Sequence, residues 1–281
     1  LGNKFLANIR EVDAIVHVVR CFEDDDITHV EGRIDPVGDA DTIETELMIS
    51  DLESLERRTD QTRKRAASKD KESMTVLPMM EASLKLLQDG KPVRTMLKGM
   101  ADEDLAILRG LNLLTSHPVL YVCNVSEDDA VDGNAHTEAV AKMAAEQGAE
   151  SIVISAAIES EVAQLPDEEA EEFLGALGLE EAGLDRLIRA GYSLLDLITY
   201  FTVGPKETRA WTIQRGTKAP GAAGGIHTDF ERGFIRAFTI AYDFCFTLGG
   251  EVPAKEAGKA RDEGKEYVVQ DGDVIHFRFN T

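Results

Sequence analysis

The sequence predicts an α/β fold, in which a parallel sheet covered by helices is interrupted by a helical insertion and followed by a smaller β-rich module. Three observations support this prediction. Three short apolar runs rich in β-branched residues lie within the first 155 residues, with helical patterns before, between and after them. Two long charged stretches with narrow apolar stripes separate the first run from the second. From about residue 197 the sequence changes to short runs separated by glycine and proline.

The predicted sheet consists of three strands, over 14–22, 119–125 and 151–155. Their apolar residues are nearly continuous, as expected for parallel strands that are buried on both faces. Strands and helices alternate along this part of the chain, which is the order that builds a parallel sheet. The helices that provide the cover are predicted over 4–11, 134–147 and 183–196.

Two helices are predicted between the first two strands, over 41–68 and 74–89. Each carries only a narrow apolar stripe on a charged surface, which favours an antiparallel coiled-coil arm over a globular core. Gly90 is a stop signal for the second helix, and a third helix over 102–115 returns the chain to the sheet. The stripe residues are Met48, Leu52 and Leu55 in the first helix and Leu77, Met80, Leu84 and Leu87 in the second.

The C-terminal module is predicted to form a β-grasp fold. Thr228 and Glu231 form a capping-box pattern that opens one helix, and residues 254–263 form a second. Trp211 is expected in the core of the module, with exposure on a binding face as the alternative. The strands are predicted over 198–203, 208–214, 236–242, 266–270 and 274–280.

The composition is that of a globular protein, with 43% hydrophobic and 29% charged residues among 281. No apolar run reaches the roughly 18–20 residues that span a bilayer, so no membrane partner is expected. Three distant cysteines fit neither a zinc site nor a disulfide framework, which favours a reducing cytoplasm.

The net charge of −22 opposes general nucleic-acid binding, but the charge is unevenly distributed. A basic stretch at 57–71 predicts a contact with a polyanion, and a solvated helix face explains it equally well. The C-terminal module is also locally basic, which is compatible with an RNA surface. The basic residues of the stretch are Arg57, Arg58, Arg63, Lys64, Arg65, Lys69 and Lys71, and those of the module are Arg209, Arg215, Lys218, Arg232 and Arg236.

The most informative motif is Asn124 at the end of an apolar run, with Glu127 three residues later. The next predicted strand ends in Ser155 and Ala156. A pair of loops of this kind forms the base pocket of GTPase-like P-loop folds, where the Asn side chain and the loop backbone read a purine edge. Glu127 is one methylene longer than the Asp of a guanine-reading loop, so guanine selectivity is expected to be lost. The alternative is that Asn124 or Ser126 caps a helix.

No Gly-x-x-x-x-Gly-Lys-(Ser/Thr) motif occurs in the sequence, so no loop is predicted to bind phosphates. The six histidines show no metal-ligand or catalytic spacing, and no Gly-x-Ser-x-Gly motif is present. His227 is expected to be structural or a contact residue. The sequence therefore predicts half of a nucleotide site, with no catalytic or metal-binding residue in this chain.

Several longer motifs resemble the YchF / Obg-like ATPase family, and they lie at 1–22, 124–127, 209–213, 225–236 and 269–279. The resemblance covers essentially the whole chain. It implies an incomplete P-loop nucleotidase domain at 1–42 and 112–196, an inserted antiparallel coiled-coil arm at 43–111, and a C-terminal β-grasp domain of the TGS type at 197–281. Phe238 and residues 244–246 depart from the more acidic pattern of the family.

The resemblance also implies roles for individual residues. Asn124, Val125 and Glu127 would form the base-reading loop, with the backbone of Val125 contacting the adenine amino group. Ser155 and Ala156 would close the opposite side of the base. The family's P-loop Lys and Ser, its magnesium-binding Thr and its Asp-x-x-Gly would precede the first residue, so none of these roles is transferred to this chain.

The function implied is Mg²⁺-dependent hydrolysis of ATP, preferred over GTP, by a ribosome-associated cytoplasmic protein with a role in translation or stress response. This chain alone is expected to be a monomer that does not hydrolyse ATP. The alternative is a non-catalytic module that binds the ribosome or RNA through the arm and the TGS domain. The residues expected at that contact are Arg57, Arg58, Arg63, Lys64, Arg65, Arg232 and Arg236.

Overall fold

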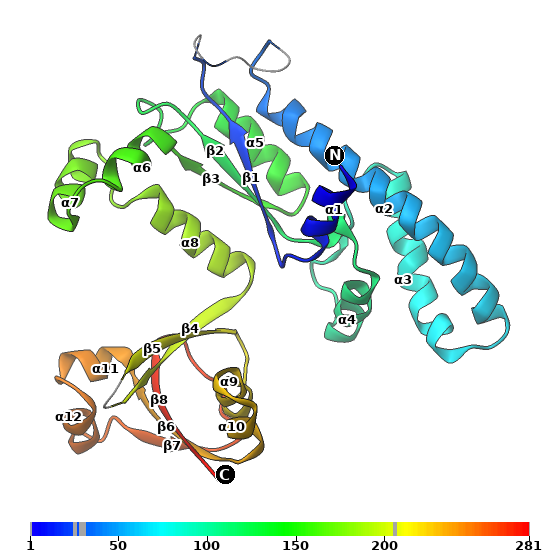
Figure 1. Cartoon of the computed structure of the whole chain (residues 1–281). Helices are drawn as coiled ribbons and strands as arrows, with labels where there is room; N and C mark the ends of the chain where they lie inside the picture. The colour runs from blue at the N-terminus through cyan, green and yellow to red at the C-terminus, as the bar shows by residue number, and fades with distance from the viewer. Residues whose placement is uncertain (1, 25–26, 28–31, 205–206, 281) are drawn as a thin grey trace. The chain divides into compact units, whose positions relative to one another are not determined.

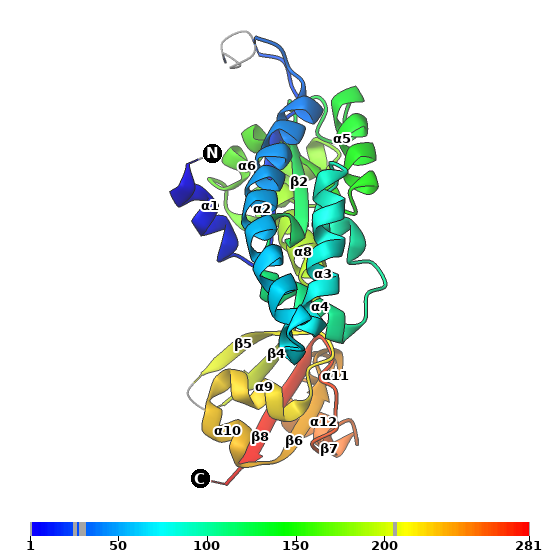
Figure 2. The same cartoon turned by 90° about the vertical axis from the view of Figure 1, so that its right-hand side faces the viewer.

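The computed structural model describes residues 2–24, 27, 32–204 and 207–280. The chain divides into two compact units, Leu1–Leu194 and Leu195–Thr281 (Figures 1 and 2). Each unit has its own sheet and its own buried core. In the part of the chain that is described, no helix combines the length and the apolar composition needed to cross a membrane.

The first unit contains a three-stranded parallel sheet in the order β1-β2-β3. Its strands are β1 (Ile15–Arg20), β2 (Val119–Asn124) and β3 (Glu150–Ile154). The first five residues of the central strand β2 are fully buried, which explains its uninterrupted apolar sequence. Asn124 pairs with Arg20 on one side and with Ile154 on the other, so β1, β2 and β3 end at the same edge of the sheet.

One face of this sheet is covered by α5 (Ala135–Glu146) and by the first turns of α2 (Pro36–Ala67). Val140 of α5 and Ala40 of α2 join Tyr121 of β2 in one buried cluster. On the other side of the sheet in Figure 1, α8 (Gly183–Leu194) packs against β2 and β3. Helix α1 (Asn3–Arg10) agrees with its prediction, whereas α6 (Ala156–Val162) and α7 (Asp167–Ala176) were not predicted.

Helix α2 begins at Pro36, five residues before its predicted start, because Asp35 accepts a hydrogen bond from the backbone N–H of Gly38 and proline is favoured in a first turn. It runs beside α3 (Lys71–Gln88), and both views show the two helices side by side. Their stripe residues Leu55, Met80 and Leu87 are buried in one cluster. Pro78 lies inside α3 rather than near its start.

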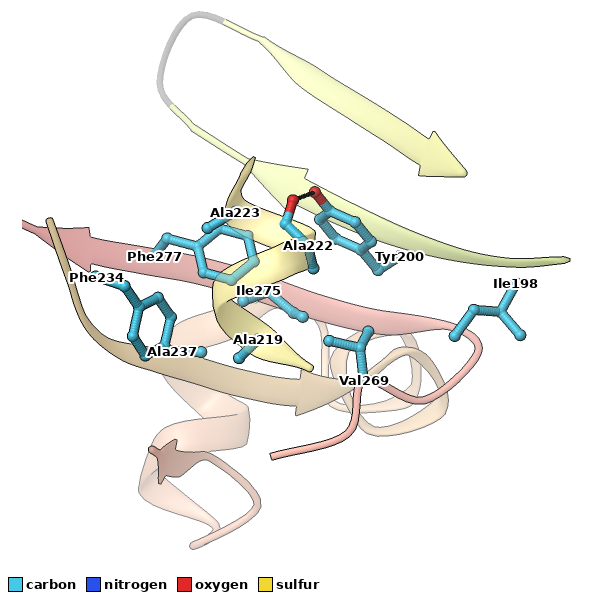
Figure 3. Packing of buried hydrophobic residues seen from close by; sticks show 10 residues of the cluster. All are labelled: Ile198, Tyr200, Ala219, Ala222, Ala223, Phe234, Ala237, Val269, Ile275 and Phe277. Carbon is cyan, nitrogen blue, oxygen red and sulfur yellow. Dashed lines mark hydrogen bonds between the residues drawn. The ribbon is translucent and has the colours of Figure 1, made fainter. Parts of the chain in front are cut away.

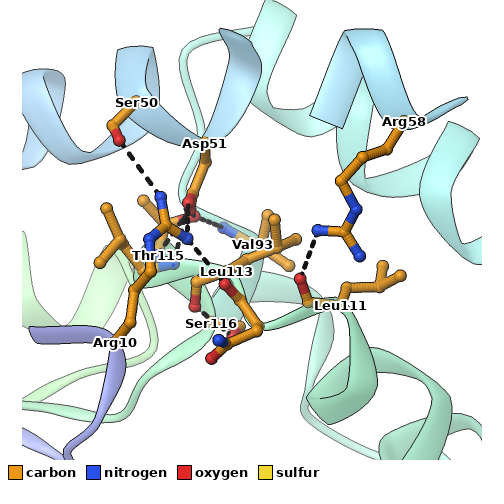
Figure 4. Close-up of polar contacts among 11 residues, drawn as sticks. Arg10, Ser50, Asp51, Arg58, Val93, Leu111, Leu113, Thr115 and Ser116 are labelled. Carbon is orange, nitrogen blue, oxygen red and sulfur yellow. Dashed lines mark hydrogen bonds and ion pairs between the residues drawn. The ribbon is translucent and has the colours of Figure 1, made fainter. Parts of the chain in front are cut away.

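The predicted third helix over 102–115 is wrong at its end. Helix α4 (Asp102–Leu111) stops at Asn112, which adopts the left-handed conformation with φ 55° and so breaks the helical path. Two short 3-10 turns, η1 (Val93–Met96) and η2 (Leu114–Ser116), flank α4. A polar cluster joins η2 to α2, because the fully buried Asp51 accepts hydrogen bonds from the backbone N–H groups of Leu114 and Thr115 (Figure 4).

The second unit contains a mixed five-stranded sheet in the order β5-β4-β8-β6-β7. Strand β4 runs parallel to β8, and the remaining neighbours are antiparallel. Helices α9 (Ala219–Ile226) and α10 (Thr228–Arg232) contribute to the core, in which the Tyr200 hydroxyl donates to the carbonyl of Ala222 (Figure 3). The strands are β4 (Leu197–Val203), β5 (Thr208–Gln214), β6 (Phe234–Ala241), β7 (Arg261–Glu263) and β8 (Asp273–Phe279).

Several predictions for this module need correction. The run 266–270 is not a strand and forms only an isolated bridge between Val268 and Lys218. The predicted helix 254–263 is shifted to α12 (Glu251–Glu256), and β7 occupies its end. Helix α9 and the short α11 (Tyr242–Thr247) were not predicted, and His227 rather than Thr228 caps α10.

Trp211 is half-buried against the core. Its ring N–H donates to the Thr202 hydroxyl, and the Arg209 guanidinium lies over its ring, 4.2 Å from the ring centroid.

Cys21, Cys123 and Cys245 are free cysteines that form no disulfide with one another.

Candidate nucleotide-base site

The two predicted base-reading loops lie next to each other. Asn124 ends β2, and Ser155 and Ala156 follow β3 directly. The Ala156 backbone N–H donates to Asn124 Oδ1 at 2.9 Å. The Asn side chain is therefore held between the two loops through its oxygen. Among the described residues, no hydrogen bond is made by its amide NH₂ group.

Val125 and Ser155 are the first residues after β2 and β3, next to Asn124 and Ala156. The Val125 N–H donates to the Ile154 carbonyl at 2.9 Å and the Val125 side chain is buried, so the loop leaves the sheet along a defined path. Ser155 is only 2% exposed, and its hydroxyl has no hydrogen-bond partner among the described residues. A buried polar group without a hydrogen-bond partner is destabilising.

Glu127 lies in the same loop, and its side chain is exposed. Its carbonyl accepts a hydrogen bond from the Ala130 N–H at 3.2 Å, so the loop turns immediately after it. The structure brings Asn124, Val125, Ser155 and Ala156 together and leaves Glu127 at the rim. The alternative interpretation of Asn124 or Ser126 as a helix cap is wrong, because Asn134 caps the following helix α5.

Asn134 is the residue of this region whose contacts sequence reasoning missed. Its Oδ1 accepts from the N–H groups of His136 and Thr137, as a helix cap does. Its Nδ2 donates to the carbonyl of Cys21 and to the Asp129 carboxylate, both at 2.8 Å. The sequence shows the cap, through Asn134 and Thr137 three residues later, but not the two contacts made by Nδ2.

The described residues contain no group of three or more His, Cys, Asp or Glu side chains that could hold a metal ion.

The basic residues predicted to contact RNA have different environments. Arg63 is paired with Glu81 and Asp60, and Arg58 donates to the Leu111 carbonyl at 2.7 Å, so both have structural roles. Arg236 lies 3.4 Å from Asp262. Arg57, Lys64, Arg65 and Arg232 are exposed and, within the described ranges, have no such close carboxylate contact.

Comparisons with known proteins agree with the motifs. A family model described as YchF-GTPase_C, "Protein of unknown function (DUF933)", matches residues 197–280. The chain is 55% identical over 281 residues to a protein of Haemophilus influenzae named ribosome-binding ATPase YchF, and 53% identical to the Bacillus subtilis protein of the same name. All of this chain and 77% of each relative are covered.

A solved structure, that of the Schizosaccharomyces pombe YchF GTPase, matches with a TM-score of 0.86 and 38% identity. The match covers 99% of this chain and 75% of that one. Sequence and structure thus confirm the resemblance inferred from the motifs, and the chain belongs to the YchF family.

Proposed function

We propose that this chain binds the adenine end of ATP at the tips of the loops after β2 and β3. The hydrogen bond from the Ala156 N–H to Asn124 Oδ1 carries the proposal, because it holds the Asn124 side chain between the loops after β2 and β3 through its oxygen, so that the NH₂ group would be the donor to a base. The hydroxyl of Ser155, which has no hydrogen-bond partner in the described part of the chain, supplies a second polar group at the same junction. The Val125 carbonyl is the acceptor proposed for the adenine amino group.

Adenine is the proposed base because Glu127 lies at the rim of the site with its carboxylate exposed. A guanine-reading carboxylate accepts from the ring N1–H and from the exocyclic 2-amino group at once, and a site built for these bonds loses binding energy when they are not made. The adenine edge does not present those two donors to the loop. We therefore expect ATP to bind more tightly than GTP.

Hydrolysis of ATP would rely on a phosphate-binding loop and Mg²⁺, which supply electrostatic stabilisation to the transferred phosphoryl group. The sequence has no Walker-type motif that would bind the phosphates. This chain alone is therefore expected to bind ATP without turning it over. Turnover belongs to the proposed activity of the complete protein, a ribosome-associated cytoplasmic ATPase with an inserted coiled-coil arm and a TGS domain.

The test is displacement of a fluorescent ATP analogue from the purified chain by ATP and by GTP. ATP should compete better than GTP, and Asn124→Ala should weaken binding by about ten- to a hundredfold, the range for an unpaired buried polar group. Asn8→Ala, at an exposed position of α1, is the matched control. Equal affinity for the two nucleotides, or release of phosphate by the chain alone, would contradict the proposal.

A second proposed function is binding to ribosomal RNA through the tip formed by α2 and α3. The observation that favours it is that Arg57 and Lys64 are exposed on α2, with no ion pair to a carboxylate among the described residues. Exposed cations on a strongly acidic protein concentrate attraction for polyanions at one place. Arg58 and Arg63 contribute less, because their guanidinium groups are already bonded.

Co-sedimentation with ribosomes at increasing salt tests this proposal. Binding should weaken steeply with salt, since phosphate contacts release counterions. Arg57→Glu with Lys64→Glu should reduce binding, whereas Lys142→Glu, an exposed lysine of α5, should not. If the chain fails to sediment with ribosomes even at low salt, the arm does not provide this contact.

A further inference from the structure

The loop that follows β2 is anchored at both of its ends by one side chain. Asn134 Nδ2 donates to the Cys21 carbonyl, and the Cys21 N–H in turn donates to the Asn124 carbonyl at 2.8 Å. The same Nδ2 donates to Asp129 Oδ2, which also accepts from the Ser126 hydroxyl at 3.2 Å. The segment between Asn124 and Asp129 is therefore held at its start through Cys21 and at its end through the carboxylate.

Asn134 uses its full hydrogen-bonding capacity in these contacts. A side-chain amide has two donor hydrogens and an oxygen with two acceptor lone pairs. Both acceptor sites are taken by the N–H groups of His136 and Thr137, and both donors by Cys21 and Asp129. The assignment of oxygen and nitrogen is fixed by these partners, since carbonyl and carboxylate oxygens only accept and backbone N–H groups only donate.

A helix cap needs only the acceptor half of this side chain, so Ser, Thr or Asp would serve the helix equally well. The two donors are in excess of that requirement, and both point to the base-reading loop and its neighbouring strand. Gly133 makes the arrangement possible: its φ is +72°, and an added Cβ would lie 2.5 Å from the Thr137 hydroxyl, which accepts from the Asn134 N–H at 2.9 Å.

We infer that Asn134 is a positioning residue for the proposed nucleotide site, acting through its amide NH₂ group to hold the 124–129 loop in its base-reading conformation. The inference rests on the proposed function for its consequence in binding. Its structural part, that the loop depends on the two donors, stands on the contacts alone.

The decisive variant is Asn134→Asp, which keeps the cap oxygen and replaces the donor by an oxygen. That oxygen would face the Asp129 carboxylate and the Cys21 carbonyl, so it removes both anchors and adds a repulsion. Asn134→Asp with Asp129→Asn exchanges the amide and the carboxylate and restores the bond at position 129. The contact with Cys21 stays broken in this double variant, so recovery should be partial.

Two measurements on the full chain distinguish the outcomes. In Asn134→Asp, hydrogen exchange at the amides of Asp129 and Ala130 should rise by about tenfold, in line with the loss of one net hydrogen bond or more, while exchange within α5 stays unchanged. The Kd for ATP should rise by a similar factor. Both should recover in part in the double variant.

Unchanged hydrogen exchange in the loop of Asn134→Asp would overturn the inference. A parallel rise of exchange throughout α5 would also overturn it, because it would show that Asn134 acts only as the cap of this helix. If loop exchange rises but the wild-type chain binds no nucleotide, the proposed function fails while the anchoring by Asn134 stands. If nucleotide binds and its Kd is the same in Asn134→Asp, the proposed function stands and the positioning role fails.

Discussion

A buried ion pair links α2 to the turn that follows α3. Arg94 donates to both carboxylate oxygens of Glu44, at 2.9 and 2.6 Å, and also to Gln147 Oε1 at 3.0 Å. The Tyr121 hydroxyl donates to the same Gln147 oxygen, and burial raises the pKa of Tyr121 to about 12. Because the side chains of Arg94 and Glu44 are 1% and 5% exposed, neither charge can be solvated if its partner is lost.

Removal of one partner of this pair is expected to destabilise the first unit strongly. Arg94→Met should lower the free energy of unfolding by about 3–5 kcal/mol, the range for an uncompensated buried charge. Adding Glu44→Leu should recover much of this loss, because no charge then remains buried. Urea unfolding followed by circular dichroism measures both variants, and a double variant no more stable than Arg94→Met would contradict the explanation.

Two half-buried histidines predict how stability responds to pH. Burial lowers the pKa of His17 and of His117 below 6.5, against opposing effects of Glu44 and Asp39 on the first and of Asp51 and Asp13 on the second. Arg94 and Arg10 lower the respective pKa values further. A lowered pKa means that the unfolded chain binds protons that the folded chain does not.

Stability is therefore expected to be complete above pH 6.5 and to fall as the pH decreases below it, by at most about 1.4 kcal/mol per pH unit for each histidine. His17→Gln should flatten this decline in urea unfolding, and His276→Gln, at an exposed position of the second unit, should not. Burial raises the pKa of Asp51, so the folded chain holds this proton more tightly and Asp51 favours folding as the pH decreases. The contribution of His17 is therefore measured as the difference between the pH profiles of the variant and the wild type. Identical pH profiles for His17→Gln and wild type would exclude this assignment.

At the scale of elements, the junction between α10 and β6 depends on one glycine. Gly233 accepts from the Asn280 N–H at 2.9 Å, and an added Cβ would overlap the backbone of Asn280. Backbone cannot move aside as a flexible side chain can, so Gly233→Ala should destabilise the second unit by about 1–3 kcal/mol or more. Thermal unfolding followed through Trp211 fluorescence measures this effect.

Gly225 provides the matched control for that variant. It lies in α9, and no atom lies within 4 Å of an added Cβ. Gly225→Ala should be neutral or stabilising by about 0.5–1 kcal/mol, because alanine loses less backbone entropy in a helix. Equal losses in the two variants would show that steric overlap with Asn280 is not the cause.

The elements that could be predicted from sequence are those with a strong local signal. The three parallel strands and helices α1, α2, α3, α5 and α8 have clear apolar periodicity or buried runs, and the structure contains all of them. Helix α9 (Ala219–Ile226) was not predicted, because three of its eight residues are glycines, which disfavour a helix. It is stabilised instead by burial of Ala219, Ala222 and Ala223 in the core. Strand β7 has three polar residues and forms only through pairing with β6.

In the candidate site, too, some contacts could be predicted from the sequence and others could not. The meeting of Asn124 with Ala156 could be anticipated, because neighbouring parallel strands end at one edge of the sheet. The anchoring of the loop by Asn134 could not, because Cys21 lies 113 positions away in sequence and no local pattern links the two residues. The hydrogen bonds of Arg58 to α4 and of Arg63 to α3 could not be predicted either, because no local pattern links them, whereas the pair of Arg63 with Asp60 lies within α2.

At the scale of the whole molecule, almost all of the net negative charge lies in one of the two units. Residues 195–281 contain 12 acidic and 11 basic side chains, whereas residues 1–194 contain 40 acidic and 19 basic ones. The net charge of −22 therefore describes the first unit, and it does not oppose contact of the second unit with nucleic acid. In the first unit, the proposed contact with a polyanion would depend on the exposed cations Arg57 and Lys64 of α2.

The second unit is expected to fold by itself. Its core is built from residues of 198–277 alone, including Tyr200, Phe234 and Phe277, and its sheet takes no strand from the first unit. A fragment of residues 195–281 should unfold cooperatively with a free energy of about 4–13 kcal/mol, the range expected for a domain of 87 residues. Circular dichroism and the dispersion of amide NMR signals check this, with Tyr200→Ala, which removes a fully buried ring, as the unfolded reference. A fragment with native-like circular dichroism but collapsed NMR dispersion would show that this core needs the first unit.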